Sequence, residues 1–532
     1  MRGSFDNSLN LTKLIIKRER LMTPLWIIML VLFSVGIAVG MGDMFPAEAR
    51  QALAETLNNP AMVAMMGPIF GADNFTIGAM YGTLMMLWIV MTVAVMNIFF
   101  IVRHTRADEE RGRVEVIRSL PTGRIANLNA AVISAVAINA VLGLLTSFCL
   151  YIINVETIDL AGSLLSGAAV FASGLLFAAI AAVFSQLSAS SRGAVGYSFL
   201  ALGVFYMMRA AGDINAEILS LLSPLGLVQR SQFFIENNWL PTIVILIQAA
   251  AVFAIAYTLN AKRDLGQGIL PARPGRSEAS KMMRSQFGLS FRLVKNTLIT
   301  WLIVMFLLGA SYGSIMGDID TFVSESEFYQ ALIGAVEGFS TAEMFTSMVN
   351  SIMALMAMIP LLIIALKLRS EEKEHRAEVV LSGVVPRINH LAGYAILAFI
   401  ASLLLQLATA LGLFLAIEAV LPGGTTLGFL LRANLVYLPA LWVKIGIAIL
   451  LTGLLPKITS VVWGYFAFSF FTVFLGRILN LPNWIANLSP FAFIPELPVD
   501  SINYAPLTVL TVIAVVLTAA GLVFYRKRDM DY

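Results

Sequence analysis

The residues whose types and spacing suggest an interaction chemistry lie in one charged segment of a largely apolar chain. This first charged segment spans residues 106–124 and reads RADEERGRVEVIRSLPTGR. It recurs once over residues 369–387, as RSEEKEHRAEVVLSGVVPR, which we call the second charged segment. Aligned without a gap, the two share Arg106/Arg369, Glu109/Glu372, Arg113/Arg376, Glu115/Glu378, Val116/Val379, Ser119/Ser382 and Arg124/Arg387. Two copies in matching places indicate a tandem duplication.

Both charged segments have the pattern of a short amphipathic helix at a membrane surface. Glu109 precedes Arg113 by four residues, and Glu372 precedes Arg376 by four, which is the favourable order for a helical ion pair. In the first copy an apolar residue also stands at every third position over 114–120. Such a helix can dock into a complementary groove on a partner and pass force to the adjoining spans. The alternative is a solvated helix that only anchors those spans.

The sequence contains no arrangement of residues that would make the chain a catalyst. It lacks the G-x-x-x-x-G-K-[ST] phosphate loop and the G-x-S-x-G nucleophile motif. The three histidines, His104, His375 and His390, show no metal-ligand spacing, and Cys149 is the single cysteine. We therefore predict a protein that is not an enzyme and has no metal or cofactor of its own.

The charged segments are positioned by apolar runs that can cross a membrane. Of the 532 residues, 59% are hydrophobic and 13% are charged, a balance typical of membrane proteins. Because a span needs roughly 20 apolar residues, the sequence predicts an all-α polytopic membrane protein with about twelve spans, six in each half. They lie near residues 24–41, 77–102, 127–153, 162–187, 193–208, 240–259, 297–316, 344–366, 391–417, 433–455, 458–475 and 507–525.

The chain divides into two six-span halves, residues 1–261 and 291–532. Residues 262–290 contain Gly and Pro among basic residues, and we interpret them as a cytoplasmic linker. Because each half has an even number of spans, the copies insert in the same direction, as parallel repeats. Lys and Arg gather around the charged segments, in the linker and near both termini, whereas residues 317–343 carry six acidic residues and no Lys or Arg. The distribution predicts cytoplasmic termini and cytoplasmic charged segments.

Two segments and one lysine are each open to two interpretations. Residues 209–239 and 476–505, before the sixth span of each half, contain Pro and are too broken to span. They are either external or re-entrant helices that cap a pathway, or plain external loops. Lys444 lies near the middle of the tenth span. Its ammonium group either snorkels to the membrane surface or pairs within the bundle, or it lines a pathway and attracts an anionic substrate.

The first charged segment resembles a motif of ABC-2 type transporter permeases. EERGRVEVI at 109–117, followed by Ser-Leu-Pro at 119–121, is similar to E-x-E-x-G-T-x-E-x-L with a Pro shortly after, which follows the second span in that family. The polar stretch before residue 21 resembles the family's interfacial elbow helix. The duplicated twelve-span form resembles exporters of polyketide antibiotics of the tetronasin-resistance type. Arg113 departs from the family's Thr, and His375 stands in place of its Gly, so the two copies need not be equivalent.

The resemblance implies that the charged segments are coupling helices that dock on two copies of a separate cytoplasmic ATPase, which binds ATP and Mg²⁺. The implied docking residues are Glu109, Glu110, Arg111, Arg113, Glu115, Glu371, Glu372, Arg376 and Glu378. The implied location is the cell membrane of a prokaryote. Met- and Phe-rich stretches at 80–100 and 344–358 favour a small amphiphilic substrate. A net charge of only +3, with basic residues in the loops, argues against a nucleic acid partner.

The main alternative is a proton-driven multidrug antiporter of the major facilitator type. That family also has twelve spans in two halves, and its loop motif resembles G-x-x-x-D-R-x-G-R-[RK], which DEERGR at 108–113 matches in part. We favour the ABC-2 interpretation for three reasons. The charged segments extend past that motif, the first external connection is long in both halves, and the predicted spans carry no carboxylate well inside.

Overall fold

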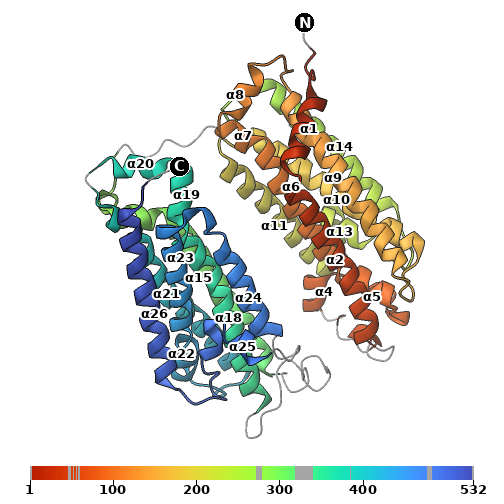
Figure 1. Cartoon of the computed structure of the whole chain (residues 1–532). Helices are drawn as coiled ribbons and strands as arrows, with labels where there is room; N and C mark the ends of the chain where they lie inside the picture. The colour runs from red at the N-terminus through yellow and green to blue at the C-terminus, as the bar shows by residue number, and fades with distance from the viewer. Residues whose placement is uncertain are drawn as a thin grey trace. The chain divides into compact units, whose positions relative to one another are not determined.

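The chain forms a helical protein (Figure 1). The computed structural model describes residues 3–45, 50–51, 53–54, 57, 60–270, 278–317, 340–383, 385–475 and 482–529. Within these ranges eleven helices are long and apolar enough to cross a membrane, which confirms an all-α polytopic membrane protein. The remaining predicted span is the shorter apolar helix α24 (Val461–Leu475). Most of the predicted acidic connection and parts of the segments at 262–290 and 476–505 lie outside the described residues.

The structure separates into two compact units, Met1–Gly275 and Arg276–Tyr532. The boundary falls inside 262–290, whose role as a linker stays a prediction. The part of this segment before residue 271 packs on the first unit, because the backbone N–H groups of Ile269 and Leu270 donate to the carbonyls of Gln186 and Leu187 at 3.1 and 2.9 Å.

The first unit is built around α10. Its helices are α1 (Ser8–Arg18), α2 (Met22–Met44), α4 (Pro60–Met66), α5 (Ile77–Leu84), α6 (Met86–His104), α7 (Arg106–Glu110), α8 (Arg113–Arg118), α9 (Ala126–Ile152), α10 (Leu160–Leu187), α11 (Ser191–Asn215), α12 (Glu217–Leu222), α13 (Pro224–Gln229) and α14 (Leu240–Lys262). α10 is the most buried of the long helices and packs against α6, α9 and α14. Gly143 and Gly167 let α9 and α10 approach closely, because a Cβ on either would collide with the other's carbonyl oxygen. Small residues at such crossings are typical of helix packing in membranes.

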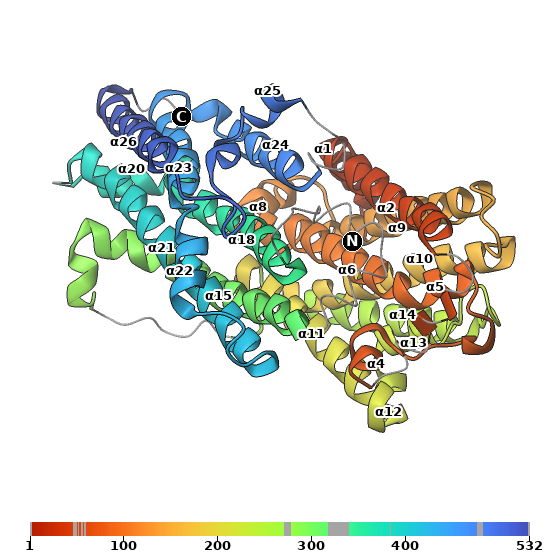
Figure 2. The same cartoon turned by 90° about the horizontal axis from the view of Figure 1, so that it is seen from below.

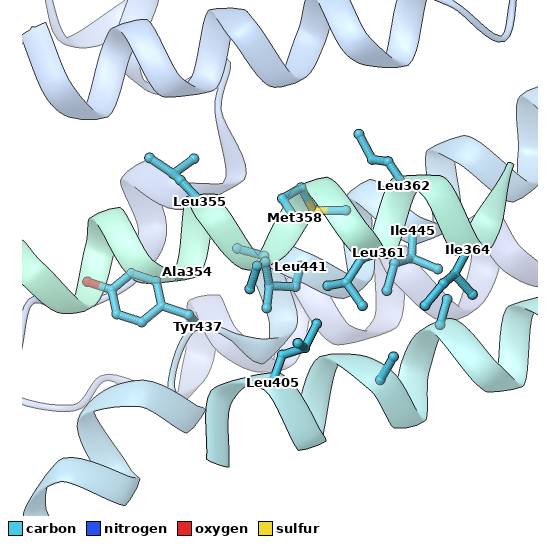
Figure 3. Close-up of a cluster of buried hydrophobic side chains, with 14 of the residues drawn as sticks. Ala354, Leu355, Met358, Leu361, Leu362, Ile364, Leu405, Tyr437, Leu441 and Ile445 are labelled. Atoms are coloured by element: carbon cyan, nitrogen blue, oxygen red, sulfur yellow. The ribbon is translucent and has the colours of Figure 1, made fainter. Parts of the chain in front are cut away.

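The second unit is built around α18. Its helices are α15 (Gln286–Ser314), α18 (Thr341–Ala365), α19 (Lys367–Lys373), α20 (Arg376–Leu381), α21 (Arg387–Val420), α22 (Leu427–Leu435), α23 (Leu438–Leu454), α24, α25 (Asn483–Ala486) and α26 (Tyr504–Lys527). α18 packs against α21 and α23, with α24 on another side (Figure 2). Met358 and Leu361 of α18 meet Leu405 of α21 and Leu441 of α23 in a fully buried cluster (Figure 3).

Several helix boundaries differ from the predicted spans for local reasons. The predicted second span breaks at Met85 into α5 and α6, and the tenth breaks before Pro439 into α22 and α23. Ser340 and Glu343 form a capping box that fixes the start of α18. The predicted fifth span, 193–208, continues as α11 to Asn215.

The segment before the sixth span of the first unit is helical over 217–229, so the plain-loop interpretation is wrong there. α12 turns back against the end of α11 (Figure 2). α13 is buried along its whole length and packs against α6, α11 and α14. In the second unit the corresponding segment contains α25 and a 3₁₀ turn at Pro490–Phe493. The external or re-entrant position of both segments stays a prediction.

Candidate functional site

Each charged segment begins with two short helices instead of one. α7 and α8 are separated by Gly112, whose φ is 69°, and α19 and α20 are separated by His375, whose φ is 57°. A positive φ ends an α-helix and turns the chain, and glycine adopts it without steric cost. The residue that departs from the family motif, His375, therefore has the same backbone conformation as the Gly of the first copy.

The predicted helical ion pairs are wrong because the helix breaks between their members. Arg113 instead pairs with the carboxylate of Asp108, at 2.9 Å from Nη1 to Oδ1. Arg376 pairs with Glu371 at the matching position, at 2.6 Å from Nε to Oε2. The hydrogen bond to Glu371 raises the pKa of Arg376. Both arginine side chains stay about half exposed.

Glu109 and Glu372 point into their units. Glu109 Oε2 lies 2.7 Å from Arg106 Nη1, and Glu372 Oε2 lies 3.2 Å from Arg369 Nη1. The two glutamate side chains are 7% and 1% exposed. Because a buried carboxylate is costly unless it is paired, these ion pairs are what allows the glutamates to lie inside.

A second arginine reaches each buried glutamate from the end of the unit's last helix. Arg263, the residue after α14, places Nη1 and Nη2 at 2.9 and 2.5 Å from the two carboxylate oxygens of Glu109. Arg528, the residue after α26, places Nη2 at 2.5 Å from Glu372 Oε1. Each unit thus ties its charged segment to the end of its sixth spanning helix.

The far end of each charged segment contacts the same arginine. Arg124 Nη2 donates to the carbonyl oxygen of Arg263 at 3.3 Å, and Arg387 Nη1 donates to that of Arg528 at 2.9 Å. The last carbonyls of a helix have no partner within it and favour cations. These paired positions, Arg124 and Arg387, are identical in the aligned segments, so the whole arrangement is duplicated.

The first charged segment has two further contacts that have no counterpart in the described part of the second. Arg18 at the end of α1 makes a two-fold ion pair with Asp108, at 2.8 and 3.1 Å. Glu110 accepts hydrogen bonds from the backbone N–H and the hydroxyl of Ser191 at the start of α11, at 2.8 and 2.5 Å. In the second unit Glu371 pairs instead with Lys367 of its own helix, at 2.9 Å.

The outer faces of α8 and α20 are exposed. Six of the predicted docking residues are exposed, namely Glu110, Arg111, Arg113, Glu115, Arg376 and Glu378, and the other three, Glu109, Glu371 and Glu372, are turned inward. Between the exposed charges lies an apolar side chain in each copy, Val116 at 69% and Val379 at 76% exposure. Each face is therefore a charged surface with a central apolar residue.

Lys444 is fully buried in α23 against α24. Its Nζ donates to the hydroxyl of Ser469 at 2.5 Å and to the carbonyl of Tyr465 at 3.0 Å. It also lies 3.4 Å from the centre of the Tyr465 ring, a cation–π contact. These contacts match the interpretation in which the lysine pairs within the bundle, and its role along a pathway stays a prediction.

Known proteins match this chain along almost its whole length. The family described as the C-terminal domain of the multidrug efflux system permease Rv1217c matches residues 18–259 and 283–526, one range in each unit. The multidrug efflux system permease protein Rv1217c of Mycobacterium tuberculosis (strain ATCC 25618 / H37Rv) is 32% identical over 543 residues, which cover 99% of this chain and 96% of that protein. The chain belongs to this permease family.

In this member of the permease family, sequence reasoning missed the arginines that follow the sixth spanning helices. In the sequence, Arg263 and Arg528 stand out only as basic residues of a predicted linker and of the C-terminal stretch. The available signal was their shared position, since each comes immediately after the last helix of its half.

Sequence reasoning also missed a buried ion pair within α11 of this permease. The predicted fifth span stopped at residue 208, but α11 continues and places Asp213 Oδ2 3.3 Å from Arg209 Nη1. Both side chains are fully or almost fully buried. Arg209 also donates to the carbonyls of Ala64 and Met65, at 2.7 and 3.1 Å. Asp213 lies at the end of the candidate span Ser191–Ile214 and not well inside it, and its partner Arg209 attaches α11 to the chain around α4.

Proposed function

We propose that this chain is the membrane-spanning permease subunit of an ATP-driven exporter of the ABC-2 type, with ATP and Mg²⁺ bound by a separate subunit. Membership in a family of multidrug efflux permeases supports the transport role. The sequence has no phosphate loop, so the energy of nucleotide hydrolysis would have to come from a partner. No observation favours the major facilitator alternative.

The observation that carries this proposal is the pair of exposed faces on α8 and α20. Each presents an arginine and a glutamate around an exposed valine, at aligned positions in the two units. An apolar residue ringed by charges suits a protein cleft, because the valine gains from burial while the charges set register and orientation. Two such faces would receive two copies of a cytoplasmic ATPase subunit.

The buried residues among the predicted docking residues are assigned a different role in this proposal. Glu109, Glu371 and Glu372 are paired inside their units and cannot reach a partner without leaving those ion pairs. We assign them to holding the charged segments in place. Docking is assigned to Arg111, Arg113, Glu115, Arg376 and Glu378, together with Val116 and Val379, whereas the exposed Glu110 is bonded to Ser191 and helps to hold the first segment.

The proposed orientation places the charged segments and both termini in the cytoplasm of a prokaryotic cell. In the first unit, the backbone of Gly123 donates to the carbonyl of Asp6 at 3.0 Å, so the N-terminal stretch lies at the same end as the charged segment. In the second unit, the bond from Arg387 to Arg528 does the same for the C-terminal stretch. The positive-inside rule then assigns these basic ends to the cytoplasm.

The proposed substrate is a small amphiphile, with polyketide antibiotics as the class that the family resemblance suggests. A cavity in the first unit has walls of the matching chemistry, although its volume of about 100 Å³ would receive only one end of such a substrate. Its walls include Trp26, Phe99 and Phe100, and its polar side includes Glu19 and Arg103. Aromatic walls with a few polar groups suit a ligand that is apolar at one end and polar at the other.

The test is co-purification of the tagged chain from its native membranes, followed by an ATPase assay. We expect an ATPase subunit to accompany the wild type and to be lost from the Val116→Asp, Val379→Asp double variant. Ile218→Asp is the matched control, because Ile218 is 73% exposed on α12, away from the charged segments. If the chain purifies alone and a proton gradient drives drug efflux, the proposal is wrong and the antiporter takes its place.

A further inference from the structure

In each unit, one set of contacts joins the charged segment to the end of the sixth spanning helix, α14 or α26. α14 ends at Lys262 and α26 at Lys527, and in both cases the next residue is an arginine with an extended backbone, ψ 141° and 135°. The chain therefore leaves each helix in the same way, which directs the two guanidinium groups to matching places.

The ion pairs of Arg263 with Glu109 and of Arg528 with Glu372 hold the charged segments rigidly against the ends of α14 and α26. Arg263 engages both carboxylate oxygens of Glu109, and its side chain is only 5% exposed. Arg528 adds a hydrogen bond to the carbonyl of Thr452, at 2.6 Å, to its bond with Glu372. Charge-assisted hydrogen bonds of this kind fix both the distance and the relative plane of the two groups, and burial removes competition from water.

Each arginine is also held through its backbone. Arg124 and Arg387 donate to the carbonyl oxygens of Arg263 and Arg528, as described above. The start and the end of a charged segment thus bond to one residue at the end of the sixth helix. A segment that moved as a body would carry that residue with it, or would have to break a buried ion pair and a backbone hydrogen bond.

We propose that Arg263 and Arg528 are positioning residues that pass a displacement of the charged segments on to α14 and α26. This inference rests on the proposed function, because an ATPase subunit must move the segments. The chain itself joins the first charged segment to α6 and α9 and the second to α18 and α21. Through their ion pairs, the arginines add a further connection, from each charged segment to the last spanning helix of its unit.

The experiment follows hydrogen exchange in the complex of the full chain with the ATPase subunit that co-purifies with it. Peptides covering 106–124, 255–263, 369–387 and 520–528 are compared with and without ATP and vanadate. The test variant carries Arg263→Gln and Arg528→Gln, and a second variant carries Arg263→Lys and Arg528→Lys, which keep the charge. Arg230→Gln is the matched control, because Arg230 pairs with the exposed Glu217 at 2.9 Å.

In the wild type and in Arg230→Gln, nucleotide is expected to change exchange in the charged segments and in 255–263 and 520–528. In the Gln variant, the change in the charged segments stays and the change at the two helix ends is lost. The Lys variant keeps part of the change at the helix ends, which a general loss of folding would not produce. An unaltered response at 255–263 and 520–528 in the Gln variant overturns the inference.

The outcomes also separate this inference from the proposed function. If no ATPase subunit co-purifies with the wild type, or if nucleotide changes nothing in the charged segments, both proposals fall. If the charged segments respond in the wild type and the ends of α14 and α26 do not, only the inference about Arg263 and Arg528 falls.

Discussion

The two charged segments share a framework and differ in what surrounds it. Both have a residue with positive φ at the same position, a buried glutamate, and an arginine that comes from the end of the sixth helix. The first segment is further tied to α1 through Arg18 and to α11 through Glu110. The second has no counterpart of those two ties among the described residues, and its Glu371 pairs within α19.

The comparison separates the contacts that both copies share from the contacts that are found in one copy. The kept contacts join the segment to the helices of its own unit, so they serve whatever both segments do. The added contacts of the first segment involve the N-terminal helix, and Arg106 donates as well to the carbonyls of Ala189 and Gly266, at 2.6 and 2.8 Å. We therefore expect the first segment to be the more rigid of the two.

The largest effect is expected from removing the buried glutamates. Glu372→Ala removes the buried carboxylate shared by Arg369 and Arg528, whose side chains are 16% and 14% exposed, and breaking such a pair costs about 3–5 kcal/mol. Glu109→Ala is expected to cost less, because Arg106 and Arg263 both keep hydrogen bonds to backbone carbonyls, such as that of Gln267 at 3.2 and 2.6 Å, whereas in the second unit such a bond is the one from Arg528 to Thr452 at 2.6 Å. The measurement is reversible unfolding in mixed micelles. Equal losses in the two variants would contradict the unequal surroundings of the two segments.

An intermediate effect is expected from breaking the tie between α1 and the first charged segment. Arg18→Gln removes the two-fold ion pair with Asp108, at a cost of about 1–2 kcal/mol, since the Arg18 side chain is partly exposed. Hydrogen exchange should quicken in α1 and leave the second unit unchanged. Lys367→Gln is the control, because Lys367 pairs with Glu371 inside one helix and ties no other element. Faster exchange of α1 in that control would show that the effect is not specific to the tie.

The smallest effect is expected at the residues with positive φ. A Cβ on Gly112 would meet no atom within 4 Å, so Gly112→Ala tests the backbone alone and should cost about 1 kcal/mol. His375→Gly should stabilise the second unit by up to about 1 kcal/mol, reduced by the loss of the exposed pair with Glu378. Thermal unfolding of the two variants checks the opposite signs. A loss of stability in His375→Gly would mean that the His375 side chain matters more than its backbone conformation.

The exposed valines allow the two segments to be compared for their contribution to docking. Val116 and Val379 have similar exposure and similar charged neighbours, so the co-purification test can be repeated with each single substitution. Two equivalent docking faces predict a similar loss of ATPase from Val116→Asp and from Val379→Asp. A loss from only one of them would show that the departure at His375 accompanies a functional difference.

The sequence by itself determined the properties that depend on composition and on neighbouring residues. The apolar runs located the spanning helices to within a few residues in most cases, because a span is defined by its own length and hydrophobicity. The recurrence of the charged segment revealed two related halves. The motif in those segments, through its resemblance to ABC-2 type permeases, was what predicted an export permease.

Only the tertiary structure decided which charges face inward and which stay exposed. Glu109 meets Arg263 across 154 residues, and Glu372 meets Arg528 across 156, so their pairing depends on where the sixth helix ends in space. The break in the first segment had a local signal in Gly112, but the break in the second had none. A histidine at 375 gives no local sign of positive φ, and without the break the spacing of Glu and Arg predicts a helical pair. Contacts between distant helices overrode that local preference, because burying a glutamate requires a partner from elsewhere in the unit.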